Sequence, residues 1–277
     1  MTHVFETPGS VALRIRIPSG RVLVETTDAP RTEVELEARG RRGEDLLDQI
    51  DVTHDERSSG HVVTIEQRDR IRWGPLQISF GGAVEVRVKC PVGTELELSG
   101  ASTEFRADGR YGKVSARTAS GDIRLGDVEG TLEVKTASGD LELARVESDN
   151  ASLVTVSGDV AVESIAGRLA LRTVSGDVAL GVARGPLKIS TTSGDVDLRS
   201  LEAGELRIES VSGDARVGIG RGTKIFVDAT SVSGDLNSDL SVGDEIPVAA
   251  REDAGSDEVV PVHVKTVSGD VRLVRAS

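Results

Sequence analysis

The sequence predicts an all-β protein that folds as a β-solenoid with about 18 residues in each coil. Two observations support this fold class. The tripeptide Ser-Gly-Asp occurs eight times, at successive spacings of 18, 19, 18, 18, 19, 21 and 35 residues. After each tripeptide, apolar and polar residues alternate, which is typical of a strand with one buried face. The eight copies begin at Ser120, Ser138, Ser157, Ser175, Ser193, Ser212, Ser233 and Ser268.

Each repeat contains two short strands joined by a corner. In the fourth copy, Val178 and Leu180 alternate with polar residues directly after the turn, and Leu187 and Ile189 do the same in the second strand. So short a unit cannot bury its own apolar face, and it must therefore stack on its neighbours. An identical turn recurs once per coil. We therefore expect parallel stacking rather than a hairpin meander, in which the strand directions would alternate.

The first third of the chain is less regular. Residues 1–95 are expected to form an N-terminal β region of degenerate coils that caps the regular solenoid of residues 96–277, because a bare terminal coil would expose unpaired strand edges. The segment EDLLDQIDVTHDERSSG, residues 44–60, interrupts the alternation and is expected to form a short helix or a long loop.

The other end of the chain departs from the period. The interval between Ser233 and Ser268 holds about 17 residues more than one coil needs, and its charge, Gly and Pro predict a projecting loop at about residues 243–260. The chain ends half a coil after the last turn. We expect this final edge to be covered by the loop or paired with another subunit.

Stacked turns form ladders of Gly and Asp. Gly suits a turn residue with positive φ, and Ser and Asp can hydrogen-bond nearby backbone N–H groups. Carboxylates about 4.8 Å apart repel by roughly 1 kcal/mol in water, so they must be solvated, hydrogen-bonded to backbone or bridged by cations. The predicted structural turn ladder comprises Gly121, Asp122, Gly139, Asp140, Gly158, Asp159, Gly176, Asp177, Gly194, Asp195, Gly213, Asp214, Gly234, Asp235, Gly269 and Asp270.

A calcium column is the functional alternative for this ladder. Each turn supplies only one carboxylate, which is few for a shell of six to eight oxygens, and we favour a structural ladder without metal or cofactor. The Thr residues before the turns raise a second alternative, an ice-binding array. They share the parity of the inward apolar residues, so we expect them to pack inside. These residues are Thr118, Thr136, Thr155, Thr173 and Thr191.

Composition narrows the function and the compartment. The net charge of −13 argues against a nucleic-acid ligand. The single cysteine, Cys90, excludes an intramolecular disulfide and suits a reducing compartment. The chain opens without a secretory signal and has no apolar run near 18 residues. We therefore expect a cytoplasmic protein without a membrane span.

No catalytic constellation is evident in the sequence. The four histidines, His3, His54, His61 and His263, show no zinc-site spacing, and the sequence has no P-loop, nucleophile elbow or dinucleotide fingerprint. A β-helix enzyme that cleaves glycans is the enzymatic alternative. Such enzymes build a cleft from long, varied loops, whereas these coils are short and nearly uniform. We predict that the protein is not an enzyme.

The repeated pattern SGDV.L......G.L.L.TVSGD, from Ser120 to Leu273 after an irregular β region, resembles the bacterial putative-adhesin β-strand repeat domains of unknown function, also called toastrack domains. The resemblance implies a right-handed, single-stranded β-helix, often found beside membrane-stress modules. We interpret the chain as a non-enzymatic scaffold or interaction module that presents an acidic face to a protein partner. The alternative from another class is a structural protein that self-assembles into filaments.

Overall fold

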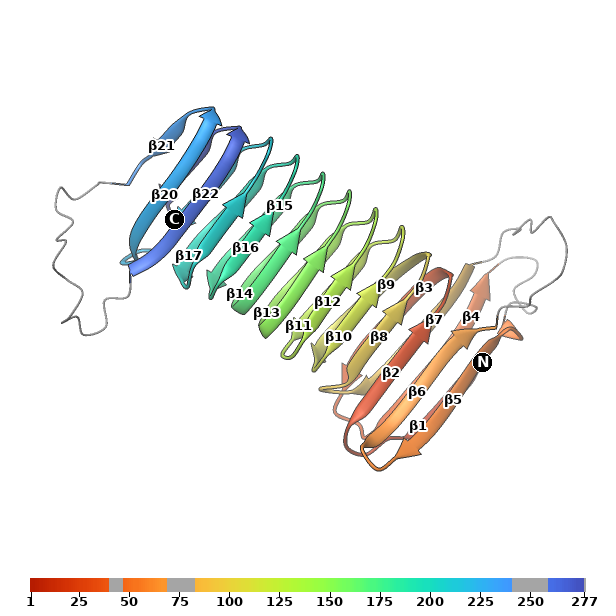
Figure 1. Cartoon of the computed structure of the whole chain (residues 1–277). Helices are drawn as coiled ribbons and strands as arrows, with labels where there is room; N and C mark the ends of the chain where they lie inside the picture. Colours follow the sequence, from red (N-terminus) through yellow and green to blue (C-terminus); the bar gives the residue numbers. More distant parts are fainter. Residues whose placement is uncertain (40–46, 69–82, 241–258, 277) are drawn as a thin grey trace, which may run out of the picture. The chain divides into compact units, whose positions relative to one another are not determined.

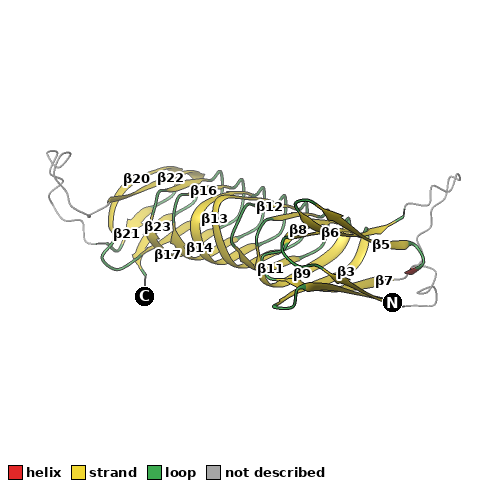
Figure 2. Ribbon diagram, turned by 90° about the horizontal axis from the view of Figure 1, so that it is seen from below, coloured by secondary structure: helices red, strands yellow, loops and turns green. Residues whose placement is uncertain are grey.

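The computed structural model describes residues 1–39, 47–68, 83–240 and 259–276. Apart from the helical residue Leu47, the regular elements in these ranges are strands, and neighbouring coils stack through parallel pairs, which confirms the all-β solenoid fold. The chain divides into two compact units, unit 1 (Met1–Ser148) and unit 2 (Asp149–Ser277). Figures 1 and 2 show their strands.

Unit 1 has two rows of strands around an apolar core. One row follows the order β5, β6, β2, β8, β10, β12, and the other follows β1, β4, β7, β3, β9, β11, β13. The pairs β1–β4, β4–β7 and β5–β6 are antiparallel, and the others are parallel. The strands are β1 (Thr2–Glu6), β2 (Val11–Arg16), β3 (Ser19–Thr27), β4 (Arg31–Arg39), β5 (Ile50–Arg57), β6 (Gly60–Gln67), β7 (Ala83–Pro91), β8 (Glu95–Ser99), β9 (Ser102–Tyr111), β10 (Val114–Arg117), β11 (Ile123–Val128), β12 (Leu132–Lys135) and β13 (Leu141–Val154), whose last residues belong to unit 2.

The register of the regular coils equals one repeat. Val114 lies beside Leu132, and Ile123 lies beside Leu141, 18 residues further along the chain. Alternate residues in each strand point inward and stack on their equivalents, which buries ladders of Val, Leu and Ile. The largest fully buried side chain among the described residues is Tyr111, whose hydroxyl lies 3.0 and 2.9 Å from the backbone oxygens of Val24 and Asp108 and shares its one hydrogen between them.

Residue 95 was the expected boundary between an N-terminal cap and the regular solenoid. The sheet of unit 1 continues across this position. β8 pairs in parallel with β2 on one side and with β10 on the other. The irregular strands and the first regular coils therefore share one core in unit 1.

The expectation of a short helix or a long loop at residues 44–60 is wrong over most of its described part. Residues 50–57 form β5, which pairs antiparallel with β6 across a turn at Ser58 and Ser59. The alternation of Ile50, Val52 and His54 continues through this acidic stretch. Asp51 and Asp55 occupy the other parity, and Glu56, which shares the parity of His54, is exposed near the turn, so these charges remain in contact with solvent.

Unit 2 repeats the two-row arrangement (Figures 1 and 2). One row follows the order β14, β16, β18, β22, β20, and the other follows β14, β15, β17, β19, β23, β21. All of these pairs are parallel. The strands are β14 (Val160–Arg172), β15 (Val178–Arg184), β16 (Leu187–Ser190), β17 (Val196–Ala203), β18 (Leu206–Glu209), β19 (Ala215–Ile219), β20 (Lys224–Ser233), β21 (Leu236–Ser238), β22 (Val259–Ser268) and β23 (Val271–Arg275).

The spatial order of the last coils differs from their order in the sequence. The C-terminal coil, β22 and β23, lies between the coil of β18 and β19 and the coil of β20 and β21. The expectation that the final edge is covered by the loop or paired with another subunit is therefore wrong, because β23 pairs in parallel with β19 on one side and β21 on the other. Val262 and Val264 of the inserted coil are completely buried, whereas Val227 of β20 is only half-buried. The predicted loop at 243–260 lies almost wholly outside the described residues.

Candidate functional site

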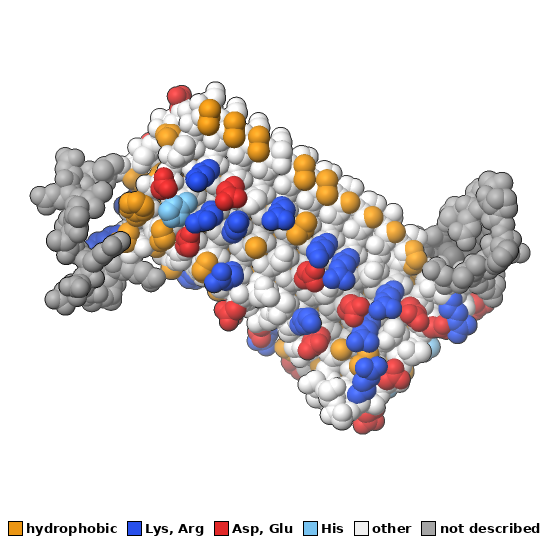
Figure 3. Space-filling model, viewed as in Figure 1, with side chains coloured by type: hydrophobic (Ala, Val, Ile, Leu, Met, Phe, Trp, Pro, Cys, Tyr) orange, Lys and Arg blue, Asp and Glu red, His pale blue; other side chains and the backbone are white. Residues whose placement is uncertain are grey.

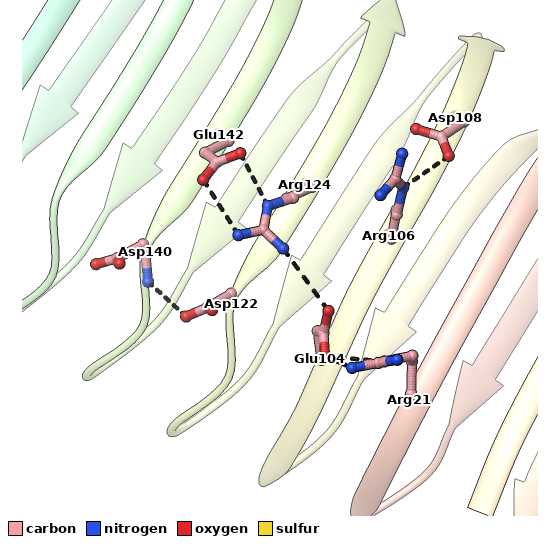
Figure 4. A network of polar contacts seen from close by, with 8 residues as sticks. All are labelled: Arg21, Glu104, Arg106, Asp108, Asp122, Arg124, Asp140 and Glu142. Carbon is pink, nitrogen blue, oxygen red and sulfur yellow. Dashed lines mark hydrogen bonds and ion pairs between the residues drawn. The ribbon is translucent and has the colours of Figure 1, made fainter.

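The Asp residues of the turns form hydrogen-bonded ladders in both units. In unit 1, the backbone N–H of Asp140 donates to Oδ1 of Asp122 at 3.1 Å (Figure 4). In unit 2, the same bond joins Asp177 to Asp159 at 2.9 Å and is repeated at each later coil. These later bonds run from Asp195 to Asp177, Asp214 to Asp195, Asp270 to Asp214 and Asp235 to Asp270, at 2.8 to 2.9 Å.

The carboxylates thus accept hydrogen bonds from backbone, one of the three arrangements that the sequence allows. The ladder follows the spatial order of the coils, so Asp270 precedes Asp235. Within the described ranges, no three side chains of His, Cys, Asp or Glu gather at the spacing of metal ligands. A backbone N–H needs an acceptor where the chain turns away from its strand, and this accounts for an Asp in every turn.

The Gly residues of the turns lie directly against the preceding coil. At Gly176, φ is +130°, and an added Cβ would overlap the carbonyl oxygen of Gly158 and lie 2.8 Å from its carbonyl carbon. Gly139 makes the same approach to Gly121 without a positive φ. Close backbone contact, more than positive φ, is therefore the requirement that all these turns share.

An exposed valine row runs beside the Asp ladder of unit 2. Val156, Val174, Val211 and Val267 each precede a Ser-Gly-Asp turn and are 51, 48, 50 and 50% exposed. Thr192 occupies the same position in the intervening coil. Figure 3 shows hydrophobic side chains in a line along this edge. The valine row and the exposed Asp column are together called the turn edge.

Backbone hydrogen bonds fix the spacing of the valine row. The N–H of Ser175 donates to the carbonyl oxygen of Val156, and that of Ser193 donates to Val174, both at 2.8 Å. The sequence contained the signal for this row, because each Val stands one residue after an inward Thr or, at Val211, after Ser210, and must therefore face outward.

The Thr column itself packs inward, as expected from its parity. Its five members are 2 to 8% exposed. An inward column offers no face to ice, so the ice-binding alternative loses its basis.

Ion pairs cover the outer face of unit 1. Arg124 lies between Glu142 and Glu104, with Nε 2.8 Å from Glu142 and Nη1 3.7 Å from Glu104 (Figure 4). Glu104 also binds Arg21 at 2.8 Å, and the hydrogen bond that Arg124 donates to Glu142 raises the pKa of the Arg124 guanidinium. Exposed pairs of this kind contribute little to stability, so their main effect is to balance charge on this face.

A shallow hollow of about 710 Å³ lies on the outer face of β14, β15, β17, β19 and β23 in unit 2. Its lining includes Ala179, Gly181 and Gly218, which have small side chains or none. Its charged lining includes Asp197 and Arg216, which face each other at 3.4 Å.

Comparison with known proteins gives one family match. Residues 12–274 match the family model Toastrack DUF4097. No curated protein matches the sequence. Within the described ranges there is no helix with the length and apolar character needed to span a membrane.

Several solved structures are similar to the chain. A putative adhesin from Parabacteroides distasonis has 10% identity, with 99% of this chain and 96% of that chain covered and a TM-score of 0.45. A putative adhesin from Bacteroides fragilis has 12% identity, the same coverages of 99% and 96%, and a TM-score of 0.39. A putative lipid binding protein from Parabacteroides distasonis has 13% identity, coverages of 99% and 96%, and a TM-score of 0.42.

Proposed function

The chain belongs to the Toastrack DUF4097 family, and from this premise we propose that it is a non-enzymatic scaffold that binds a protein partner along its turn edge. The observation that carries the proposal is the valine row of unit 2. A row of exposed apolar side chains, here interrupted only by Thr192, is unusual on a protein surface and marks an interaction site.

The acidic column beside the row defines the complementary partner. Asp159, Asp177, Asp195, Asp214 and Asp270 are all exposed and follow the valine row at the same coil spacing. A partner segment that fits both columns carries apolar side chains next to Lys or Arg. Charge complementarity of this kind selects partners and speeds their association.

Site-directed photo-crosslinking tests the proposal. A photoreactive residue at position 174 is compared with one at position 188, where Lys188 is exposed on β16 outside the turn edge. We expect a discrete protein to be crosslinked from position 174 and not from position 188. With the photoreactive residue at position 192 instead, we expect the same crosslink, and we expect it to disappear when Val156, Val174 and Val211 are all replaced by Ser. Equal capture from positions 174 and 188 would contradict the proposal. Circular dichroism establishes that the triple variant is folded.

Self-assembly into filaments is the second candidate, and a specific observation favours it. Among the described strands, β20 pairs only with β22 and β21 only with β23, so this coil has an edge without a strand partner. Phe226 and Leu236 on it are 52 and 50% exposed. Edges of this kind are templates for pairing with another chain. Sedimentation velocity would show concentration-dependent growth that Phe226→Glu abolishes.

Three further parts of the proposal concern activity, compartment and pathway. We propose that the chain is cytoplasmic, consistent with the lone buried thiol of Cys90, and that it serves envelope-stress sensing, as the resemblance to toastrack domains implies. Cell fractionation and the stress-gene response of a deletion strain test these two parts. The glycan-cleaving alternative is tested on a polysaccharide panel, with Asp197→Asn as the variant that would lower any activity of the hollow.

A further inference from the structure

Three of the four histidines lie on the terminal strands of unit 1. His54 Nε2 on β5 lies 3.0 Å from His61 Nδ1 on β6. The Phe5 ring on β1 lies 5.1 Å from the His54 ring, and His3 stacks on Phe5 at 6.3 Å. His61 is only 8% exposed, while His54 is half-buried. The histidine pair is therefore held by the fold and is open to solvent on one side.

The β5–β6 hairpin brings the pair together. In its register, His54 lies opposite Val63 and Glu56 lies opposite His61. Directly opposed residues of an antiparallel pair share a face, as do residues two apart in one strand. His54, Glu56 and His61 therefore project from the same face. Val11 of β2 lies beside His61 on its other side.

The facing nitrogens can share only one proton. In the hydrogen bond between them, one nitrogen carries hydrogen and the other presents a lone pair. A metal ion that replaces this proton receives a lone pair from each ring. Imidazole nitrogens bind divalent metals at about 2.0–2.1 Å, so two ligands at 90° are about 2.9 Å apart and two at the tetrahedral angle are about 3.4 Å apart.

From this geometry we propose that His54 and His61 form a binding site for a divalent transition-metal ion of square-planar or octahedral preference, the class of Ni²⁺ and Cu²⁺. The nitrogen separation of 3.0 Å equals that of neighbouring positions in such a shell, but the ring centroids, 5.2 Å apart, show that the two lone pairs face each other, so both rings turn toward a common point when the ion binds. Glu56 supplies the third ligand. Since no three ligand side chains converge among the described residues, the exposed Glu56 changes rotamer when the ion binds.

Calorimetric titration of the full chain with Ni²⁺ tests the site. All proteins carry His3→Gln, because a free amino terminus with His in the third position is itself a chelator of Ni²⁺ and Cu²⁺. We expect one equivalent of Ni²⁺, with affinity reduced about tenfold or more by His54→Gln or His61→Gln, since loss of a ligand costs at least as much as loss of an outer partner. Glu56→Gln should weaken binding less.

His263→Gln is the matched control, because His263 lies on β22 next to Asp228, in unit 2. Absence of Ni²⁺ uptake, or uptake unchanged by His54→Gln, would overturn the proposal. If the more buried His61 variant fails to fold, His54→Gln decides alone. Electron paramagnetic resonance of bound Cu²⁺ gives an independent result: the proposal requires two coordinating ring nitrogens, reduced to one by His54→Gln.

Discussion

Substituting Ala for Gly176 tests whether the stacked turns depend on close backbone contact between coils. The new Cβ would overlap the carbonyl group of Gly158, and φ at this position is +130°, which side chains rarely adopt. The backbone strain costs about 1–3 kcal/mol. Relieving the overlap separates the two turns, where Ser175 N–H binds Val156 at 2.8 Å and Asp177 N–H binds Asp159 at 2.9 Å.

These inter-coil hydrogen bonds contribute about 1 kcal/mol each, and Ala also reduces the entropy of the unfolded chain by an equivalent of about 0.4–1 kcal/mol. We therefore expect Gly176→Ala to lower the free energy of unfolding of unit 2 by about 3 kcal/mol. Gly222→Ala is the matched control: its φ is +83° and nothing lies within 4 Å of the added Cβ. It should cost only about 1 kcal/mol.

Urea unfolding followed by circular dichroism measures the difference. A gap of about 2 kcal/mol between the two variants corresponds to about 1 M urea at a slope of about 2 kcal/mol per M. Hydrogen exchange at the turns then locates the loss. Unfolding of both variants at the same urea concentration would refute the argument that backbone contact, rather than positive φ, dictates Gly in the turns.

Four further results are expected. Asp177→Ala should destabilise the chain by about 1 kcal/mol in urea unfolding, and Asp177→Asn by less, because Asn keeps an acceptor for the next coil; equal losses would argue against the ladder. Hydrogen bonds from neighbouring cations lower the pKa of Glu133, so its stabilising contribution is complete above the unfolded-state pKa and is lost as pH falls through the lower folded-state pKa. Glu133→Gln should accordingly be less stable than wild type at pH 7 and equally stable at pH 2, as measured by unfolding at both pH values. Burial raises the pKa of the Cys90 thiol to about 11, so a thiol reagent at pH 8 should react with it far more slowly in buffer than in urea. Amide exchange should be slower in β23, which has strand partners on both sides, than in β21 at the edge.

Local alternation in the sequence was sufficient to predict the coils. Val178 and Leu180 in one turn-following strand, and their equivalents a coil later, could point only inward once the turns stack. Parity also predicted that Thr173 is buried. The same rule places Val174, the next residue, on the outside. The valine row is therefore also encoded in the alternation of the sequence.

Long-range order was not predictable in the same way. The inward residues of β20, β22 and β18 are all aliphatic or small, so alternation cannot distinguish which coil lies next to Leu206. The contact between His54 and His61 could not be predicted for a related reason. The spacing of His54 and His61 resembles no metal motif, and they meet only because the acidic segment before Ser58 forms a strand.

The position of the C-terminal coil bears on how the protein is made. During synthesis, β20 and β21 leave the ribosome before β22 and β23, yet their final neighbours are those later strands. Until residue 275 has emerged, the coil of β20 and β21 is the next coil available to β18 and β19. In the folded protein, however, β18 and β19 pair with β22 and β23. The native order of unit 2 is therefore completed only after β23 has been translated, by a step in which a later coil takes a position between two earlier ones.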